Sequence, residues 1–188
     1  MYTKKEALEL MKKYADKYGN KDVYGKVMEH TKSVQKKAVE VAEKAISNGQ
    51  EIDIEFIKAA VILHDIGRFK YSPWSKESIR HGIEGAEILK EEGWPESFQR
   101  VCERHIGVGI LKKDIEEQEL PLPKKNYLPE TKEEKIICYA DNLCAHNIIT
   151  NEKEVIERYR KELGEEHGKR VEKFHEEIHE LIVGSKKL

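Results

Sequence analysis

Several histidine and aspartate side chains of this sequence fall on helix faces that are otherwise apolar. His64, for example, extends the series formed by Ile57 and Val61 at the three- and four-residue spacing of one helix face. The residues placed in this way are His30, His64, His81, His105 and Asp141. Taken singly, each histidine is interpreted as a hydrogen-bonded core residue, but a buried aspartate is costly without a partner or a cation. Imidazole and carboxylate groups are ligands of divalent metals, so the joint pattern predicts a metal site in the core.

The order of these residues resembles the signature of the HD superfamily of metal-dependent phosphohydrolases. His30 comes first, the string His-Asp-Ile-Gly follows from His64, and Asp141 completes the series. This string is the form found in the HDIG group, and the Tyr-Ala-Asp-Asn-Leu segment at residues 139–143 is similar to one in small, mostly archaeal HDIG proteins. The resemblance covers roughly residues 23–148. It implies that one metal ion is bound by His30, His64, Asp65 and Asp141.

Two further histidines resemble the extra metal ligands of dinuclear HD proteins. His81 opens the string His-Gly-Ile-Glu-Gly, and His105 lies in Cys-Glu-Arg-His-Ile-Gly. These positions look like the second pair in the HD-GYP phosphodiesterases and in the HD-type diadenosine tetraphosphate hydrolases. The resemblance implies that Asp65 bridges two metals. The Gly-Tyr-Pro element is missing, which disfavours cyclic di-GMP, and Asn-Leu-Cys-Ala-His-Asn after Asp141 replaces the Glu-Pro-x-Arg-like segment of the dinucleotide hydrolases.

The function that this resemblance implies is hydrolysis of a phosphoester or phosphoanhydride bond in a nucleotide or small phosphorylated metabolite. One or two divalent ions (Mn, Fe, Ni, Co, Zn or Mg) would lower the pKa of a bound water and make hydroxide available near neutral pH. The expected catalytic residues are Asp65 and Arg68, because Arg68 directly follows the metal motif and a guanidinium suits bidentate phosphate contact. The expected substrate-binding residues are Arg68, Arg104, Lys135 and His146.

Two other functions fit the same ligand set. Some HD proteins are diiron oxygenases, and six ligands permit this chemistry. The other is a non-catalytic binding module that keeps a structural metal, although a complete ligand set argues against lost catalysis. A redox-inert native metal together with phosphate release would eliminate the oxygenase. A sealed cavity with no open metal position would favour the binding module.

Helical periodicity dominates the elements that must position these residues, so we expect an all-α HD-domain helical bundle with the metal site at its centre. Residues 1–188 are expected to form one domain, with its core at about 23–148 and the charged helices of 152–183 packed on it. The helices are expected at about 3–17, 23–47, 53–67, 78–92, 95–106, 131–146, 152–163 and 165–183. Residues 107–130 are irregular around one turn of helix near 111–118, which is typical of functional lids. The histidines expected to be exposed on the last helices are His167, His175 and His179.

Composition excludes several classes of protein. The 188 residues include 34 Lys and Arg and 36 Asp and Glu, giving a net charge of −2, whereas nucleic-acid-binding proteins usually carry a basic excess. The three cysteines form no Cys-x-x-Cys pair, so we expect no disulfide framework and a reducing cytoplasm. Apolar runs do not approach the roughly 20 residues of a membrane span. The expected partner is a small phosphorylated substrate, and the 152–183 surface is compatible with a homodimer.

Overall fold

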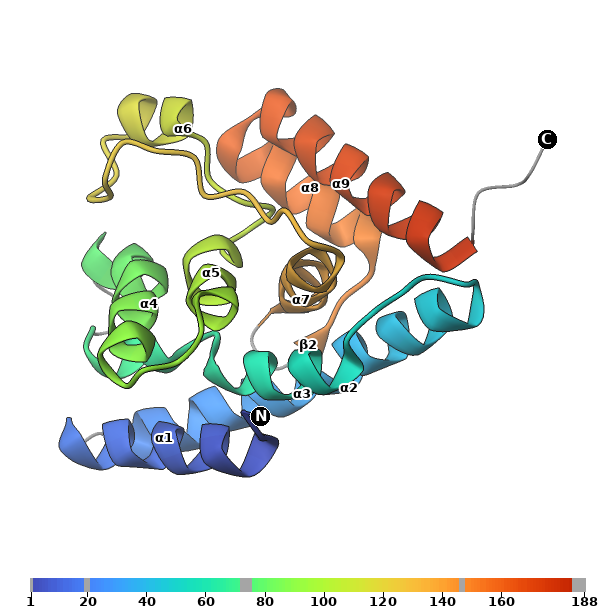
Figure 1. Ribbon diagram of the computed structural model, residues 1–188. Helices are drawn as coiled ribbons and strands as arrows, with labels where there is room; N and C mark the ends of the chain where they lie inside the picture. The colour runs from blue at the N-terminus through green and yellow to red at the C-terminus, as the bar shows by residue number, and fades with distance from the viewer. Residues whose placement is uncertain (1, 19–20, 72–75, 146–147, 184–188) are drawn as a thin grey trace.

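α-Helices form nearly all of the regular structure in the computed structural model, which describes residues 2–18, 21–71, 76–145 and 148–183 (Figure 1). The α-helices are α1 (Lys4–Lys17), α2 (Lys21–Ser47), α3 (Ile54–Leu63), α4 (His81–Glu91), α5 (Glu96–Arg104), α6 (Lys112–Glu117), α7 (Lys132–Leu143), α8 (Glu152–Leu163) and α9 (Glu165–Val183). Two short 3-10 helices, η1 (Ile66–Phe69) and η2 (Lys76–Arg80), lie between α3 and α4. The predicted all-α class is confirmed.

Several helices start where the sequence predicts, and a side chain caps the N-terminus of each of them. The Thr3 hydroxyl and the Glu6 carboxylate form a capping box at α1, and the Asp53 carboxylate accepts the backbone N–H of Phe56 at 2.9 Å. Thr131 caps α7 by accepting the N–H of Glu134 at 3.1 Å. Such caps satisfy backbone donors that a helix start leaves unpaired.

Helix α7 ends earlier than the sequence predicts, at Leu143 instead of residue 146. Cys144 leaves helical geometry, and β1 (Cys144–Ala145) pairs antiparallel with β2 (Ile148–Ile149). The predicted helix therefore stops short, because Cys144 and Ala145 pair with Ile149 and Ile148 instead of continuing α7. Ile148 is 65% exposed in β2.

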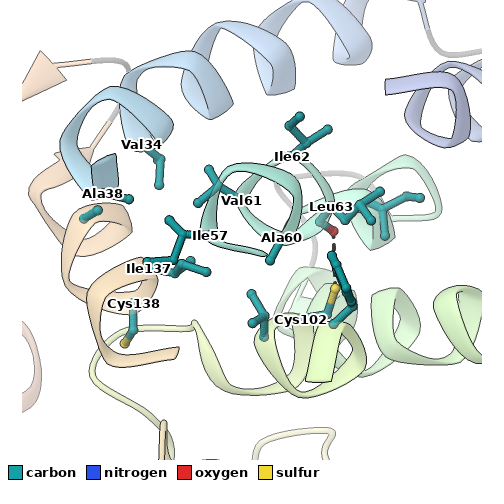
Figure 2. Packing of buried hydrophobic residues seen from close by; sticks show 14 of the residues in the cluster. Val34, Ala38, Ile57, Ala60, Val61, Ile62, Leu63, Cys102, Ile137 and Cys138 are labelled. Carbon is teal, nitrogen blue, oxygen red and sulfur yellow. Dashed lines mark hydrogen bonds between the residues drawn. The ribbon is translucent and has the colours of Figure 1, made fainter. Parts of the chain in front are cut away.

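The core is built around α3, whose second half is apolar and buried on every side. Figure 2 shows its side chains pointing in different directions, toward Val34 and Ala38 of α2, Cys102 of α5 and Ile137 of α7. All of the residues from Ala59 to Leu63 are at most 2% exposed. A helical segment that is apolar all round must be enclosed by neighbours, and α1, α2, α5 and α7 all contact α3. The residue that follows α3, His64, is thereby placed in the interior.

Residues 107–130 pack as a small unit of their own instead of an open loop. Its core consists of Ile110, Ile115, Leu122 and Tyr127. The backbones of Ile110 and Tyr127 exchange hydrogen bonds of 3.1 and 2.7 Å, and the predicted turn of helix is α6. Asp114, buried in α6, accepts the N–H of Leu111 and both bonds of the Arg170 guanidinium, at 2.9 and 2.7 Å. Helix α9 therefore anchors this segment.

The C-terminal helices α8 and α9 pack against each other, and α9 contacts α2 and α7 (Figure 1). The predicted exposure of His175 is wrong: its side chain is buried, and its ring lies edge-on to Tyr139 at 5.2 Å. His167 is also largely covered and lies 3.3 Å from the Asp114 carboxylate, whereas His179 is exposed as predicted. His175 has many charged neighbours in the sequence, so the pattern predicts exposure. The buried face of α9 that packs on α7 is too narrow to be recognised from that pattern.

The cysteines Cys102, Cys138 and Cys144 are free and buried. Among the helices in the described ranges, none has both the length and the apolar character that crossing a bilayer requires.

Removing the Asp114 carboxylate is expected to loosen residues 107–130. Asp114→Ala should lower the free energy of unfolding by about 2–4 kcal/mol, because it leaves Arg170 and a helix N-terminus without their acceptor. Chemical denaturation measures the change, and limited proteolysis should show new cleavage between residues 107 and 130. Glu116→Ala, on the exposed side of α6, is the control and should change stability by less than about 0.5 kcal/mol. Equal behaviour of the two variants would show that Asp114 is not the anchor.

Candidate metal centre

Six polar side chains converge where α2, α3, α4, α5 and α7 meet. One comes from the middle of α2, two from the turn after α3, one from the first residue of α4, one from the end of α5 and one from the last turns of α7. They are His30, His64, Asp65, His81, His105 and Asp141, and subsets of their ligand atoms lie within 4.8 Å of one another. The structure thus brings together every residue of the predicted ligand set, although their role as ligands stays a prediction.

The Asp65 carboxylate lies between two pairs of histidines. Its Oδ2 atom is 3.8 Å from Nε2 of His30 and 3.7 Å from Nε2 of His64. Its Oδ1 atom is 3.2 Å from Nε2 of His81 and 3.4 Å from Nε2 of His105. Each oxygen therefore faces a different pair, which is the arrangement of a carboxylate able to bridge two cations.

The Asp141 carboxylate belongs to one of these two halves. Its Oδ1 atom lies 2.8 Å from Nε2 of His30 and 3.5 Å from Nε2 of His64. One half of the centre therefore offers two imidazoles and two carboxylates, and the other offers two imidazoles and one carboxylate oxygen. Mixed nitrogen and oxygen sets of this kind suit divalent transition metals.

Backbone carbonyls orient three of the imidazoles. Nδ1 of His64 lies 2.6 Å from the Val61 carbonyl, and Nδ1 of His81 lies 2.7 Å from the Ser78 carbonyl. Nδ1 of His105 is 2.8 Å from the carbonyl of Cys102. Because a carbonyl only accepts, each Nδ1 must donate its hydrogen, and in the neutral ring Nε2 then carries the lone pair. Such support fixes the tautomer that a metal ligand needs.

Several buried atoms of the centre lack the partners that burial normally requires. The Nε2 atom of His64 has no hydrogen-bond partner among the described residues. The Nε2 atoms of His81 and His105 face each other at 3.1 Å, although both rings already donate through Nδ1. Two facing lone pairs repel unless a proton or a cation lies beside them. These residues therefore fit divalent cations better than they fit one another.

Burial and neighbouring charges shift the pKa values of His64 and His81 in opposite directions. Burial lowers the pKa of His64, but the carboxylates of Asp65 and Asp141 outweigh it and raise this pKa to about 9. Burial, together with the charge of Arg68, lowers the pKa of His81 to about 4. Although burial alone would raise the pKa of Asp65, the Arg68 guanidinium and the His64 ring hold it well below its usual range. Without a cation, His64 is therefore protonated at neutral pH and His81 is neutral.

The centre is open to solvent on the side formed by α2, η1 and α7. The side chains of His30 and Asp141 are each 17% exposed, and that of Arg68 is 33% exposed. The other four side chains of the centre are almost fully buried. A solute can therefore approach past His30, Asp141 and Arg68. A cavity sealed on all sides, which would favour a purely structural metal, is not what the described residues form.

The residues predicted to bind substrate lie at different distances from this opening. Arg68, in η1, lies at the centre itself, with Nε 2.7 Å from Oδ1 of Asp65. Arg104 pairs with Glu130 at 2.8 Å and also with Glu134, and Lys135 pairs with Glu177 at 2.8 Å. His146 lies outside the described residues. Because carboxylates already neutralise Arg104 and Lys135, their contact with substrate stays a prediction.

Two glycines that sequence reasoning did not single out let the helices of the centre approach. A Cβ atom on Gly67 would lie 2.0 Å from the carbonyl oxygen of His81, and one on Gly82 would lie 2.7 Å from that of Cys102. These distances are far below van der Waals contact, so the approach of η1 to α4, and of α4 to α5, requires glycine. The sequence offered one signal for this role: Gly67 closes the string that contains His64 and Asp65, and Gly82 directly follows His81.

Comparison with known sequences gives one family and several relatives. A family model of the HD domain matches residues 27–146. An uncharacterised protein of Methanocaldococcus jannaschii is 41% identical, over 83% of this chain and 89% of that protein. The tRNA (cytidine(56)-2'-O)-methyltransferases of Thermoplasma volcanium and Picrophilus torridus are each 37% identical, over 88% and 81% of this chain. The chain spans less than half the length of these two enzymes, 45% and 41%.

Comparison with solved structures shows a shared fold. The HD domain of the phosphodiesterase PgpH from L. monocytogenes has a TM-score of 0.51 and 19% identity, covering 85% of this chain and 91% of that domain. The same domain in complex with cyclic-di-AMP has a TM-score of 0.51 and 18% identity. At these identities the likeness establishes the helical fold.

The affinity for a divalent metal is expected to increase with pH from about 6 to about 9, by up to about ten-fold per unit, because a metal competes with a proton for Nε2 of His64. The pKa of His64 is about 9, so this proton must be released throughout the range. His81, with its pKa of about 4, is already neutral and adds no slope. Equilibrium titration with Mn²⁺ at several pH values measures the slope. A flat profile for the wild type would contradict the raised pKa, and His64→Ala should bind more weakly with a smaller slope.

Proposed function

We propose that this chain, which belongs to the HD domain family, is a metal-dependent phosphohydrolase. The family model covers residues 27–146, which confirms the resemblance seen in His30, the His-Asp-Ile-Gly string and Asp141. Its expected reaction is the hydrolysis of a phosphoester or phosphoanhydride bond in a nucleotide or small phosphorylated metabolite. The fold shared with a phosphodiesterase HD domain agrees with this class of reaction.

The observation that carries the proposal is the position of Asp65. Because its two oxygens face different histidine pairs, we propose that Asp65 bridges two cations. His30, His64 and Asp141 would complete one site, and His81 and His105 the other. Four imidazoles favour Mn, Fe, Co, Ni or Zn over Mg, which prefers oxygen ligands. Divalent ions bound here would lower the pKa of water and stabilise negative charge on a phosphoryl group.

Arg68 is the residue proposed to contact the phosphoryl oxygens. It lies on the open side of the centre and is partly exposed, so its guanidinium can meet both the solvent and a bound solute. It pairs with Asp65 in this structure. A cation at Asp65 would compete for the same oxygen, which would leave the guanidinium donors available to phosphate. Charge-assisted bidentate bonds from arginine are among the stronger contacts that a phosphate can receive.

The names of the relatives suggest different reactions, and the site favours hydrolysis. Two relatives are named for methyl transfer to tRNA, but the segment shared with this chain is under half of each enzyme. Buried imidazoles with an unpartnered nitrogen, clustered around two aspartates, are instead typical of a metal centre. The phosphodiesterase HD domain is described in complex with cyclic-di-AMP, so a nucleotide is the substrate class to test first.

A screen of phosphomonoesters, phosphodiesters and nucleotides with Mn, Fe, Co, Ni, Zn and Mg is expected to reveal metal-dependent hydrolysis. Asp65→Ala should lower the rate by at least about 100-fold, because the variant lacks the carboxylate on which both halves depend. Asp16→Ala, an exposed aspartate of α1, serves as the control and should keep full activity.

Two outcomes of this screen would reject the hydrolase. Wild-type protein that hydrolyses no phosphate substrate with any of the metals would contradict it. If the iron-loaded protein consumes oxygen and releases no phosphate, the diiron oxygenase becomes the better assignment than the hydrolase.

Metal analysis after gel filtration is expected to find two ions per chain in the wild type. His81→Ala should retain about one, because it removes a ligand of one half and leaves His30, His64 and Asp141 intact. His179→Ala removes an exposed histidine of α9 that pairs with Glu152, and it should still retain two. One ion in the wild type would show that Asp65 is not a bridge.

A further inference from the structure

Arg158 of α8 differs from the other arginines of the chain in what surrounds its charge. An aspartate or glutamate forms an ion pair with each of Arg68, Arg80, Arg100, Arg104, Arg160 and Arg170. Among the described residues, no carboxylate forms an ion pair with Arg158. Its guanidinium instead lies over the ring of Tyr159 at 5.5 Å and donates to the amide oxygen of Asn142 at 3.4 Å.

Asn142, which receives this contact, directly follows the predicted metal ligand Asp141 in α7. Its side chain is buried, and its Nδ2 atom has no hydrogen-bond partner within the ranges that the structure describes. Buried polar atoms are normally paired, so an unpaired one needs a reason. Here the amide uses its oxygen to hold a guanidinium whose remaining donors stay unpaired with any carboxylate.

Tyr159 fixes the other side of this guanidinium. A Cβ atom on Gly107 would lie 2.9 Å from the Tyr159 hydroxyl, so the phenol packs against the loop that follows His105. Burial raises the pKa of Tyr159 to about 12 despite the neighbouring Arg158 charge. The phenol therefore stays neutral and fills the space between the loop after His105 and the last turns of α7. Arg158 is held in place by two neighbours that do not neutralise it.

We infer that Arg158 binds a second anionic group of the substrate, beside the phosphoryl group at the metal centre, with Asn142 as its positioning residue. The inference rests on the proposed phosphohydrolase function and narrows its substrate class. Asn142 directly follows Asp141, so the guanidinium that it holds lies at the same end of α7 as this predicted ligand. A second anion-binding group at this end of α7 suits a substrate with two phosphoryl groups, such as a nucleoside diphosphate or a diphosphate ester.

Chemical complementarity favours an anion over other ligands. The guanidinium of Arg158 offers N–H donors that no carboxylate among the described residues pairs with. A phosphate offers acceptor oxygens and negative charge, and arginine binds it with two parallel bonds. Arg158 is partly exposed, so a solute can reach it. By contrast, Arg104 and Lys135 already have carboxylate partners.

Binding of inorganic phosphate and of methylenediphosphonate to the Mn²⁺-loaded full chain tests this inference without requiring turnover. Calorimetry measures both affinities, and the metal content is determined before and after each titration. The wild type should bind the diphosphonate more tightly than phosphate. Arg158→Gln should weaken diphosphonate binding by about 10- to 100-fold, the worth of a charge-assisted hydrogen bond, and should leave phosphate binding unchanged.

Three further variants separate a binding role from a structural one. Arg158→Lys keeps the charge and should restore part of the diphosphonate affinity. Asn142→Leu should give an intermediate loss, because the guanidinium is no longer held. Arg160→Gln removes an arginine two residues away that pairs with Glu157 and Glu172, and it should bind both anions as the wild type does.

Equal diphosphonate affinity in Arg158→Gln and the wild type would overturn the inference. So would a wild type that shows no preference for the diphosphonate, or that binds neither anion. Failure of the proposed hydrolysis is a separate result, because it appears in the activity screen while the loss of anion binding in Arg158→Gln remains measurable.

Discussion

The buried carboxylate of Asp65 is the constraint on which the rest of the structure depends. Four imidazole nitrogens and one guanidinium lie within 3.8 Å of its two oxygens. Removing a carboxylate from water is costly unless cations or donors replace its hydration. Three of the surrounding histidines, His64, His81 and His105, turn Nδ1 toward backbone carbonyls, so in their neutral form they present a lone pair on Nε2. A cation is the partner that satisfies both the carboxylate and the histidines.

The fold meets this constraint through close approach of short elements. The second half of α3, from Ala59 to Leu63, is apolar and buried, so its end places His64 and Asp65 in the interior. Gly67 and Gly82 then remove the side chains that would separate η1, α4 and α5. Carbonyls at the ends of α3 and α5, and of η2, orient the imidazoles that follow them. The packing of α3, the close approach at the two glycines and the imidazole tautomers therefore depend on one another.

The C-terminal helices complete this arrangement from outside. Through Arg170, α9 holds the segment of residues 107–130, and through Tyr159, α8 packs on the loop that follows His105. These contacts come from residues far along the chain from the HD signature. The same helices place Arg158 beside α7.

The sequence by itself determined the helices, the inward faces and the identity of the candidate ligands, because apolar periodicity and caps are local properties of the chain. It was wrong about His175, whose burial depends on α7, and about the end of α7, where the chain turns back into β1 and β2. Only the tertiary structure decided that the oxygens of Asp65 face different histidine pairs and that Arg158 has no carboxylate partner among the described residues. These facts are distances between atoms of separate helices, and no spacing along a single helix encodes them.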